Sequence, residues 1–273
     1  MSSKLQLKIV FLGMLLVLAR GILHAETTNT SGLCRDPISY VLDKCKSHDV
    51  VLLGTRHKQP ALLDLISRLL LKLGDAGVSY LGLEIASDQQ PIIDRYIKEG
   101  TGLDEISLHY ALDCPGTRNV LGIARNLSIE NGVKVNALDL PPSFYQKNFN
   151  RDEWMARSIC TIFDENPNAK ALVIVGNLHT LKTIRWKHYI PHRHGFIPSY
   201  LYRLKPALRM SSICQCIKHA PLICDFCKNL GGKGKPAAID CDDSFSGWKL
   251  GILEKVATES MKPHEVVDGV IVH

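Results

Sequence analysis

Two histidines follow apolar, strand-like runs at matching positions. The run VVLLGTRH covers residues 50–57, and LVIVGNLH covers residues 172–179. In both runs a glycine ends the apolar stretch, and a histidine stands three residues after that glycine. Histidine serves as a general base and as a metal ligand, because its ring nitrogens change charge near neutral pH. The repeated spacing predicts that His57 and His179 are presented at one edge of a sheet.

Acidic residues stand at two further strand-like ends. Glu84 lies one residue before the end of one such run, and Asp139 directly follows another. In an open α/β sheet, ligands bind beyond the carboxyl ends of the strands. Two imidazoles and a carboxylate are the usual ligands of a catalytic divalent metal that keeps one position open for water. We therefore predict a divalent metal site made by His57, Glu84 and His179, with Glu84 as a ligand or as the general base. The alternative for a single histidine of this kind is a hydrogen-bonded structural role.

A further polar pair opens a predicted helix at residues 150–164. We predict that Arg151 contacts the substrate or an oxyanion formed from it. We predict that Asp152 takes part in catalysis by orienting an imidazole or accepting a proton, a role for which Asp139 is the other candidate. Acids are also favoured in the first turn of a helix by its dipole, so Asp152 has a purely structural alternative.

These residues need a scaffold of alternating strands and helices. Apolar runs stopped by glycine, proline or polar residues predict strands, and apolar residues at helical spacing predict helices between them. The alternation predicts an α/β fold with one mainly parallel sheet, right-handed crossovers and helices flanking the sheet. The predicted strands are 49–53, 79–85, 133–138, 171–175 and 266–272, and the predicted helices are 59–73, 90–98, 103–112, 118–130 and 150–164.

The first 25 residues have the layout of a secretory signal, with a basic start, an apolar middle and a small-residue exit. We predict a signal peptide at 1–25, an α/β domain at 34–273, and export to the periplasm, cell envelope or extracellular space. A retained membrane anchor is the alternative for 1–25. Cleavage would lower Lys plus Arg from 33 to 30 against 27 Asp plus Glu, so the formal charge would fall from +6 to +3. This near-neutral balance, without a basic stripe, does not indicate a nucleic-acid partner.

The C-terminal third is rich in cysteine and histidine. Five of the nine cysteines are Cys214, Cys216, Cys224, Cys227 and Cys241. We predict that these cysteines cross-link a cysteine-rich insertion at 205–247. The cross-links would be disulfides in an exported chain or, alternatively, a zinc ion bound by the thiolates. His188, His192 and His194 predict a solvated loop, and a histidine or tyrosine of this region could bind haem iron.

The order of the motifs resembles that of a known group of proteins. Gly54-Thr-Arg-His57, Gly176-Asn-Leu-His179 and the intervening Glu84 are similar to motifs shared by the Tiki/TraB/ChaN superfamily, which includes erythromycin-esterase-like enzymes. The stretches 82–85, 90–97 and 151–156 resemble the ChaN branch, and 268–272 resembles the final strand of the family. The resemblance covers about 48–182 and that last strand. Thr55 departs from ChaN-like and esterase-like members, which carry an acid after the first glycine.

The resemblance implies two different activities. Tiki-like members are regarded as metal-dependent proteases, and ChaN-like members as haem-binding proteins linked to iron uptake. The leading expectation is therefore a metal-dependent hydrolase that acts on a peptide or a small molecule, with a divalent metal ion as its cofactor. The alternative expectation is a non-catalytic haem- or iron-binding protein of the envelope.

Overall fold

The computed structural model describes residues 34–147, 149–184, 195–216, 235–242 and 262–273. All of these ranges belong to one compact unit, Cys34–His273. The predicted signal peptide lies outside the described residues, and so do Cys224, Cys227 and the predicted histidine-rich loop. None of the described helices is both long and apolar enough to cross a membrane.

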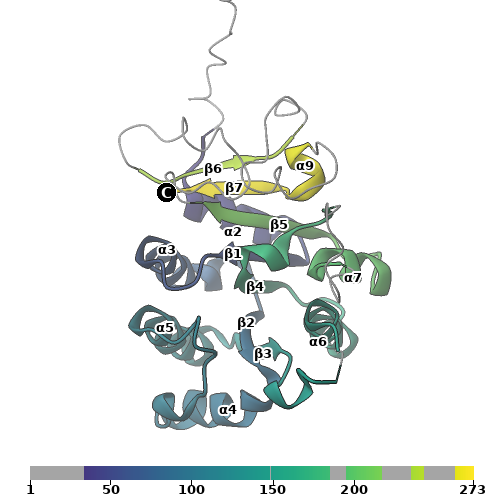
Figure 1. The fold of residues 1–273 in the computed structure, drawn as a ribbon. Coiled ribbons are helices and arrows are strands. Elements are labelled where there is room, and N and C mark those ends of the chain that lie inside the picture. The colour runs from purple at the N-terminus through teal and green to yellow at the C-terminus, as the bar shows by residue number, and fades with distance from the viewer. Residues whose placement is uncertain (1–33, 148, 185–194, 217–234, 243–261) are drawn as a thin grey trace, which may run out of the picture. The chain divides into compact units, whose positions relative to one another are not determined.

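The described residues form a seven-stranded sheet with the strand order β3-β2-β4-β1-β5-β7-β6 (Figure 1). The strands are β1 Val50–Thr55, β2 Tyr80–Ala86, β3 Lys134–Asp139, β4 Ala171–Gly176, β5 Met210–Cys216, β6 Ala237–Asp240 and β7 Gly269–Val272. Neighbouring strands pair in parallel, except that β6 pairs antiparallel with β7. The predicted α/β class with a mainly parallel sheet is confirmed.

Helices cover both faces of this sheet. On one side lie α2 Pro37–Ser47, α3 Pro60–Leu70, α4 Gln90–Glu99 and α5 Pro115–Asn131, and on the other lie α6 Arg151–Glu165 and α7 Ile197–Leu204 (Figure 1). A short helix, α9 Pro263–Val266, precedes β7. Side chains alternate across a strand, so Val51 and Leu53 of β1 pack with the first group and Val50 and Leu52 with the second. The central strands are therefore buried on both faces, as their apolar sequences require.

The predicted helix at 103–112 is wrong. Only a 3₁₀ turn, η4 Leu103–Glu105, forms there, and the rest of the segment is irregular. Ile106 is 1% exposed and Leu108 packs against the same core, so tertiary packing holds the segment without a helix. The described residues also form the 3₁₀ turns η2 Leu73–Ala76, η3 Ser87–Gln89, η5 Pro142–Phe144 and η6 Asn177–Thr180.

The cysteine-rich segment contributes strands to the sheet. Strand β5 carries Cys214 and Cys216 and pairs with the central strand β1, and β6 forms an edge. No disulfide joins any two of the seven cysteines that the structure describes. Cys214, Cys216 and Cys241 are instead buried in an apolar cluster with residues of β6, β7 and α9. This placement puts these three cysteines in the core rather than in a surface loop.

Candidate functional site

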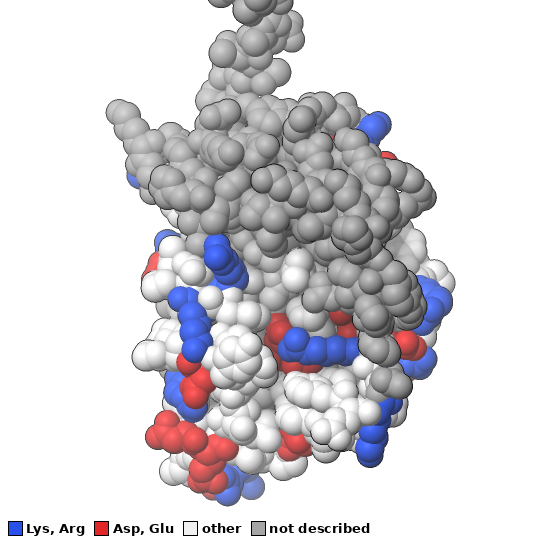
Figure 2. Space-filling view, viewed as in Figure 1, with Lys and Arg blue, Asp and Glu red and all other residues white. Residues whose placement is uncertain are grey.

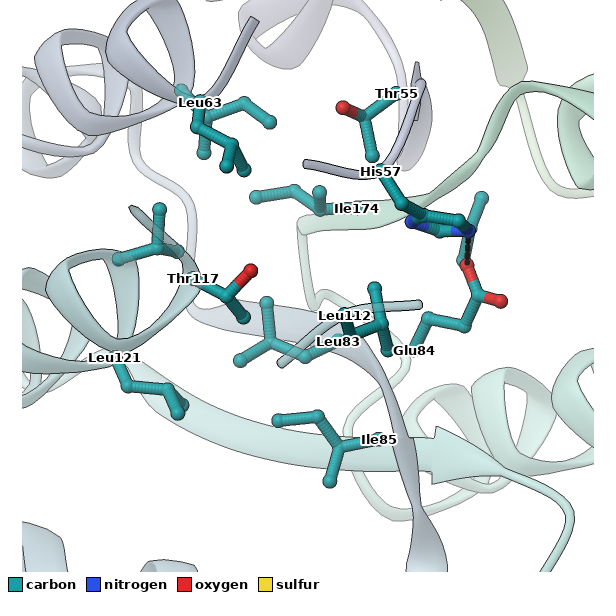
Figure 3. A pocket seen from close by; sticks show the side chains of 13 residues that line it. Thr55, His57, Leu63, Leu83, Glu84, Ile85, Leu112, Thr117, Leu121 and Ile174 are labelled. Atoms are coloured by element: carbon teal, nitrogen blue, oxygen red, sulfur yellow. Dashed lines mark ion pairs between the residues drawn. The ribbon is translucent and has the colours of Figure 1, made fainter. Parts of the chain in front are cut away.

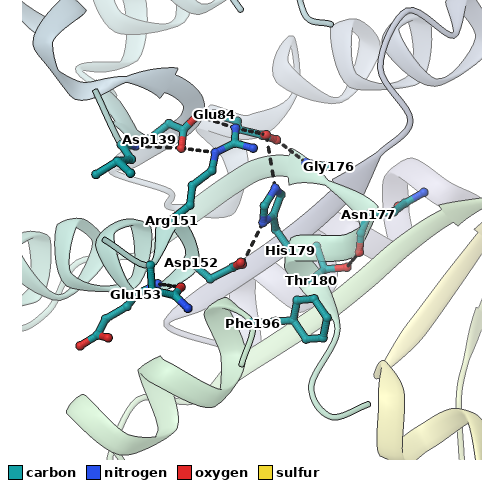
Figure 4. Close-up of polar contacts among 12 residues, drawn as sticks. Glu84, Asp139, Arg151, Asp152, Glu153, Gly176, Asn177, His179, Thr180 and Phe196 are labelled. Atoms are coloured by element: carbon teal, nitrogen blue, oxygen red, sulfur yellow. Dashed lines mark hydrogen bonds and ion pairs between the residues drawn. The ribbon is translucent and has the colours of Figure 1, made fainter. Parts of the chain in front are cut away.

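The site lies where the three neighbouring strands β2, β4 and β1 end. Glu84 is the fifth residue of β2, Gly176 ends β4, and His57 follows β1 by two residues. His179 stands in η6, directly after β4. Parallel strands deliver their carboxyl ends to one edge, and the structure brings His57, Glu84 and His179 together there. The helix start with Arg151 and Asp152 reaches the same edge from α6 (Figure 4).

Glu84 is the centre of this cluster and is only 5% exposed. Its Oε1 accepts a hydrogen bond from Arg151 Nη2 at 2.6 Å and lies 3.4 Å from His179 Nε2. Its Oε2 accepts from the backbone N–H of Gly176 at 2.5 Å. Burial alone would raise the pKa of Glu84, but the bond to His179 and the charges of His179, Arg151 and His57 lower that pKa to about 2. The carboxylate is therefore ionised at neutral pH and is a weak base.

His179 is clamped between two carboxylates. Its Nδ1 lies 2.8 Å from Asp152 Oδ1, while its Nε2 faces Glu84 (Figure 4). Burial opposes the charged imidazole, but hydrogen bonds to Asp152 and Glu84 and the charges of both acids raise the pKa of His179 to about 9. At neutral pH this ring is charged, with a proton on each nitrogen.

Arg151 is fixed by a second buried acid. Its Nε donates to Asp139 Oδ1 at 2.6 Å, and its Nη2 donates to Asp139 Oδ2. Asp139 is 2% exposed and also accepts from the N–H of Leu140. Burial opposes the charged guanidinium, but Asp139 and Glu84 raise the pKa of Arg151. None of the described residues accepts a hydrogen bond from Nη1 of Arg151, whose side chain is 33% exposed. Figure 2 shows positively and negatively charged side chains side by side in the middle of the face of the molecule that it presents.

His57 has different surroundings. Its Nε2 lies 3.9 Å from Glu84 Oε2, and its Nδ1 is buried without a hydrogen-bond partner among the described residues. Burial lowers the pKa of His57 most strongly, and the positive charges of His179, Arg151 and His109 lower it further. The negative charge of Glu84 raises this pKa and offsets only part of the lowering. The ring is therefore uncharged at neutral pH. The next residue, Lys58, has a φ of 59°, so the chain turns sharply after the histidine.

The motif glycines are explained by close contacts. A Cβ on Gly54 would collide with Oδ1 of Asn177, and a Cβ on Gly176 would lie 3.0 Å from His57 Nε2. Asn177 needs this space because its side chain joins η6 to β5. Its Nδ2 donates to the carbonyl of Gln215 at 2.6 Å, and its Oδ1 accepts from the N–H of Gln215 at 3.0 Å. Sequence reasoning missed this role of Asn177, because its partner lies far along the chain.

A pocket of about 50 Å³ opens beside the cluster, between the sheet and helices α3 and α5 (Figure 3). Nine of the thirteen residues that line it are aliphatic, and they come from β2, β4, α3, α5 and the segment before α5. Thr55, His57 and Glu84 also line it. Sequence reasoning missed the pocket. The sequence did carry a signal for two helix faces, in the helical spacing of Leu63 with Ile66 and of Thr117 with Leu121. That spacing does not show that a pocket remains between the two helices.

The predicted metal ligands are occupied by other partners. Both oxygens of Glu84 accept hydrogen bonds from protein donors, and His179 bonds to Asp152 and faces Glu84 with its other nitrogen. In the part of the chain that the structure describes, no group of three His, Cys, Asp or Glu side chains has an arrangement that could hold a metal ion. A divalent ion would have to break the pairing of Glu84 and remove a proton from His179, so these residues do not fit it as they are arranged.

Solved structures share this fold. An erythromycin esterase, EreC, in its open conformation superposes with a TM-score of 0.60 at 11% identity, over 86% of this chain and 92% of that one. A Bacillus cereus protein gives a TM-score of 0.59 at 13% identity, over 87% and 91%. ChaN of Campylobacter jejuni, in a structure with cofacial haem, gives 0.53 at 11% identity, over 85% and 90%. The fold is ChaN-like and EreC-like.

No protein-family model matches the sequence, and no curated protein matches it. At these identities the superpositions establish the fold and leave the activity to the chemistry of the site. The part of the predicted resemblance that refers to ChaN and to erythromycin esterases is thus confirmed at the level of the fold. None of the structures compared above carries the name Tiki.

Proposed function

We propose that the protein is a hydrolase that cleaves a carboxylic ester or amide and uses His57 and His179 as its base and acid. The observation that carries the proposal is the contrast between two imidazoles that face one carboxylate. His179 is held between Asp152 and Glu84, whereas His57 has no strong partner. Groups whose surroundings push their pKa values apart are typical of the acid and the base of an active site. The EreC-like fold is consistent with hydrolysis.

The two histidines divide the proton transfers. Uncharged His57 accepts a proton from a water molecule, and the water oxygen attacks the carbonyl carbon. The bond from that carbon to the leaving oxygen or nitrogen then breaks, and charged His179 donates a proton to the leaving atom. Exchange with solvent removes the proton from His57 and restores the one on His179. One water is consumed, and a carboxylic acid and an alcohol or amine are formed.

Arg151 supplies the charge for the intermediate. Asp139 and Glu84 hold its guanidinium in one orientation, which leaves Nη1 to donate to the oxyanion that forms at the carbonyl oxygen. Because the guanidinium is fixed before the substrate arrives, it does not have to reorient during the reaction. Glu84, with its low pKa, acts here as an anchor for Arg151 and His179 rather than as the base.

The test is the hydrolysis of p-nitrophenyl acetate by the His57→Gln variant. Loss of the general base should lower kcat by about 10²–10⁴-fold. The control is His48→Gln, because His48 lies at the end of α2 and bonds to Lys44 and Ser47. If His57→Gln retains the wild-type rate, His57 is not the base.

Dialysis against EDTA separates this proposal from the metal-dependent hydrolase expected from the sequence. Hydrolysis should continue after dialysis, because the proposed steps use only groups of the chain. A loss of activity that a divalent ion restores would assign the reaction to a metal.

Haem binding is the second candidate. It is favoured by the ChaN-like fold and by an apolar pocket beside the uncharged imidazole of His57. His57 would then be an axial ligand of the iron. Haemin added to the purified protein should produce a sharp Soret band at a fixed stoichiometry, and His57→Gln should abolish it. Without such a band in the wild type, the haem candidate is wrong.

A further inference from the structure

We propose that the pocket between α3 and α5 binds the aliphatic acyl chain of the substrate, and that the Thr55 hydroxyl hydrogen-bonds the carbonyl oxygen of the same acyl group. The substrate class is thereby an ester of an unbranched aliphatic acid. This inference rests on the proposed hydrolase, because it assigns a substrate to that site.

The residues that line the pocket favour an aliphatic acyl chain over an aromatic or charged group. Leu83, Ile85 and Ile174 form its floor on the sheet, and Leu63 and Leu121 stand on the helices that cover it (Figure 3). Among the described residues that line it there is no Phe, Tyr or Trp, so these residues offer a planar ring no such aromatic side chain to stack on. These residues include no Lys or Arg either, so they offer no permanent positive charge to an anionic group. An uncharged, flexible hydrocarbon chain matches this surface best.

Among the described residues that line this pocket, two have a buried polar atom without a partner: His57, at Nδ1, and Thr55. Thr55 is 5% exposed, and its Oγ1 has no hydrogen-bond partner among the described residues. By contrast, the hydroxyl of Thr117, which also lines the pocket, contacts Cys114 Sγ at 3.4 Å. Buried hydroxyls in native proteins are nearly always bonded, so an unpaired one facing a pocket indicates a missing acceptor.

The position of Thr55 identifies that acceptor. Thr55 ends β1 and precedes His57 by two residues, and both line the same pocket (Figure 3). An acyl chain that fills the aliphatic part of the pocket therefore places its ester carbonyl group beside Thr55, His57 and Glu84. The carbonyl oxygen is the hydrogen-bond acceptor at that end of an ester. The pocket thus holds the acyl chain while the reacting carbon lies beside the proposed base.

Chain length is the direct test. Rates are measured with p-nitrophenyl acetate, butyrate, hexanoate and octanoate. Each buried methylene should raise kcat/KM by about fourfold until the chain fills the pocket. Thr117→Phe should shift the preference to shorter chains, because Thr117 is only partly buried and a larger side chain there would narrow the pocket. Ile129→Phe is the control: Ile129 is 58% exposed on the same helix and should leave the chain-length preference unchanged. Equal kcat/KM for all four esters would overturn the inference.

Thr55 is tested on octanoate with two variants. Thr55→Val keeps the shape but removes the hydroxyl, and it should lower kcat/KM by about tenfold, since one hydrogen bond is worth about that factor. Thr55→Ser should retain most of the rate. If Thr55→Val matches the wild type, the hydroxyl does not contact the ester.

Calorimetry with octan-1-ol separates this inference from the proposed function, because the alcohol cannot be hydrolysed. In one outcome the protein binds one octan-1-ol, Thr117→Phe weakens this binding, and no ester is hydrolysed. That outcome would support the acyl pocket and reject the hydrolase. Hydrolysis without octan-1-ol binding or chain-length preference would retain the hydrolase and reject the acyl pocket. Absence of both hydrolysis and binding would reject both.

Discussion

Two histidines from matching motifs have opposite electrostatic surroundings. His179 is charged because Asp152 and Glu84 surround it, and His57 is uncharged because burial dominates. The difference comes from which element packs beside each ring: the start of α6 supplies Asp152 to one histidine only. Identical spacing in the sequence therefore does not imply identical chemistry.

We expect a bell-shaped dependence of kcat/KM on pH. The pKa of His57 is lowered from 6.5, so the base is active above this pKa and the rate falls as pH drops through it. The pKa of His179 is about 9, so the acid is active below this pKa and the rate falls as pH rises through it. Initial rates with ethyl acetate, whose alkoxide leaving group needs a proton, measure both the acid and the alkaline side of the profile. An alkaline rate that stays level beyond pH 9 would remove His179 as the acid.

Thr55→Val should stabilise the free protein. The wild-type hydroxyl is buried without a partner, and its desolvation costs about 1–3 kcal/mol, which valine avoids. Urea unfolding measures the free energy of unfolding. Thr117→Val is the matched control: its hydroxyl has a partner in Cys114, so its removal should bring no gain in stability. A less stable Thr55→Val variant would mean that the hydroxyl is already satisfied in solution.

At the scale of elements, the turn η6 is tied to strand β5. Asn177 exchanges two hydrogen bonds with the backbone of Gln215, and Gly54 leaves the space for its side chain. His179 lies on the same short turn, so the tie fixes the position of the proposed acid. The sheet thus positions the site both through the strands that carry its residues and through the neighbouring strand β5.

Asn177→Ala should destabilise the protein by about 2–4 kcal/mol, because it leaves both backbone groups of buried Gln215 without their partner. Thermal or urea unfolding measures the loss. Asn119→Ala is the control, since Asn119 is exposed and makes one side-chain bond, to Ser67; we expect a change below about 1 kcal/mol. Equal effects of the two variants would contradict the structural role of Asn177.

The elements also show what the sequence could predict. Strands β1 to β4 are apolar runs and were predictable, and the order of motifs placed His57, Glu84 and His179 at one edge. Strand β5 was not, because its Ser211, Ser212 and Gln215 look like loop residues, although all three are buried. Partners of Ser212 and Gln215, among them Asn177, come from elsewhere in the chain. Pairing and pocket shape depend on such distant contacts, so no local pattern encodes them.

At the scale of the whole molecule, the buried charges make stability depend on pH. Glu84 has a folded pKa of about 2 against 4.5, so its contribution is present above pH 4.5 and is lost as pH falls toward 2. His179 has a folded pKa of about 9 against 6.5, so its contribution is present below pH 6.5 and is lost as pH rises toward 9. Together they favour greatest stability at mildly acidic pH.

Melting temperatures across the pH range check this expectation. Wild type should melt at the highest temperature near pH 6.5 and lose stability on both sides, because the lowered pKa values of His57 and His273 also remove stability as pH falls below 6.5. In the Glu84→Gln variant the melting temperature should fall less steeply toward acidic pH, because no carboxylate remains to be protonated at this position. A wild-type profile without a decline toward pH 2 would contradict the ionised, paired state of Glu84.

The place of β1 in the sheet has a consequence for synthesis on the ribosome. Residues 50–55 emerge early, yet both neighbours of this strand, β4 and β5, come more than 100 residues later. Until about residue 216 has left the ribosome, a nascent chain carries this apolar strand with an unpaired edge. Such long-range parallel pairing is slow and leaves edges open to aggregation. The strand order that brings His57 to the site therefore leaves β1 exposed to aggregation until its late partners emerge.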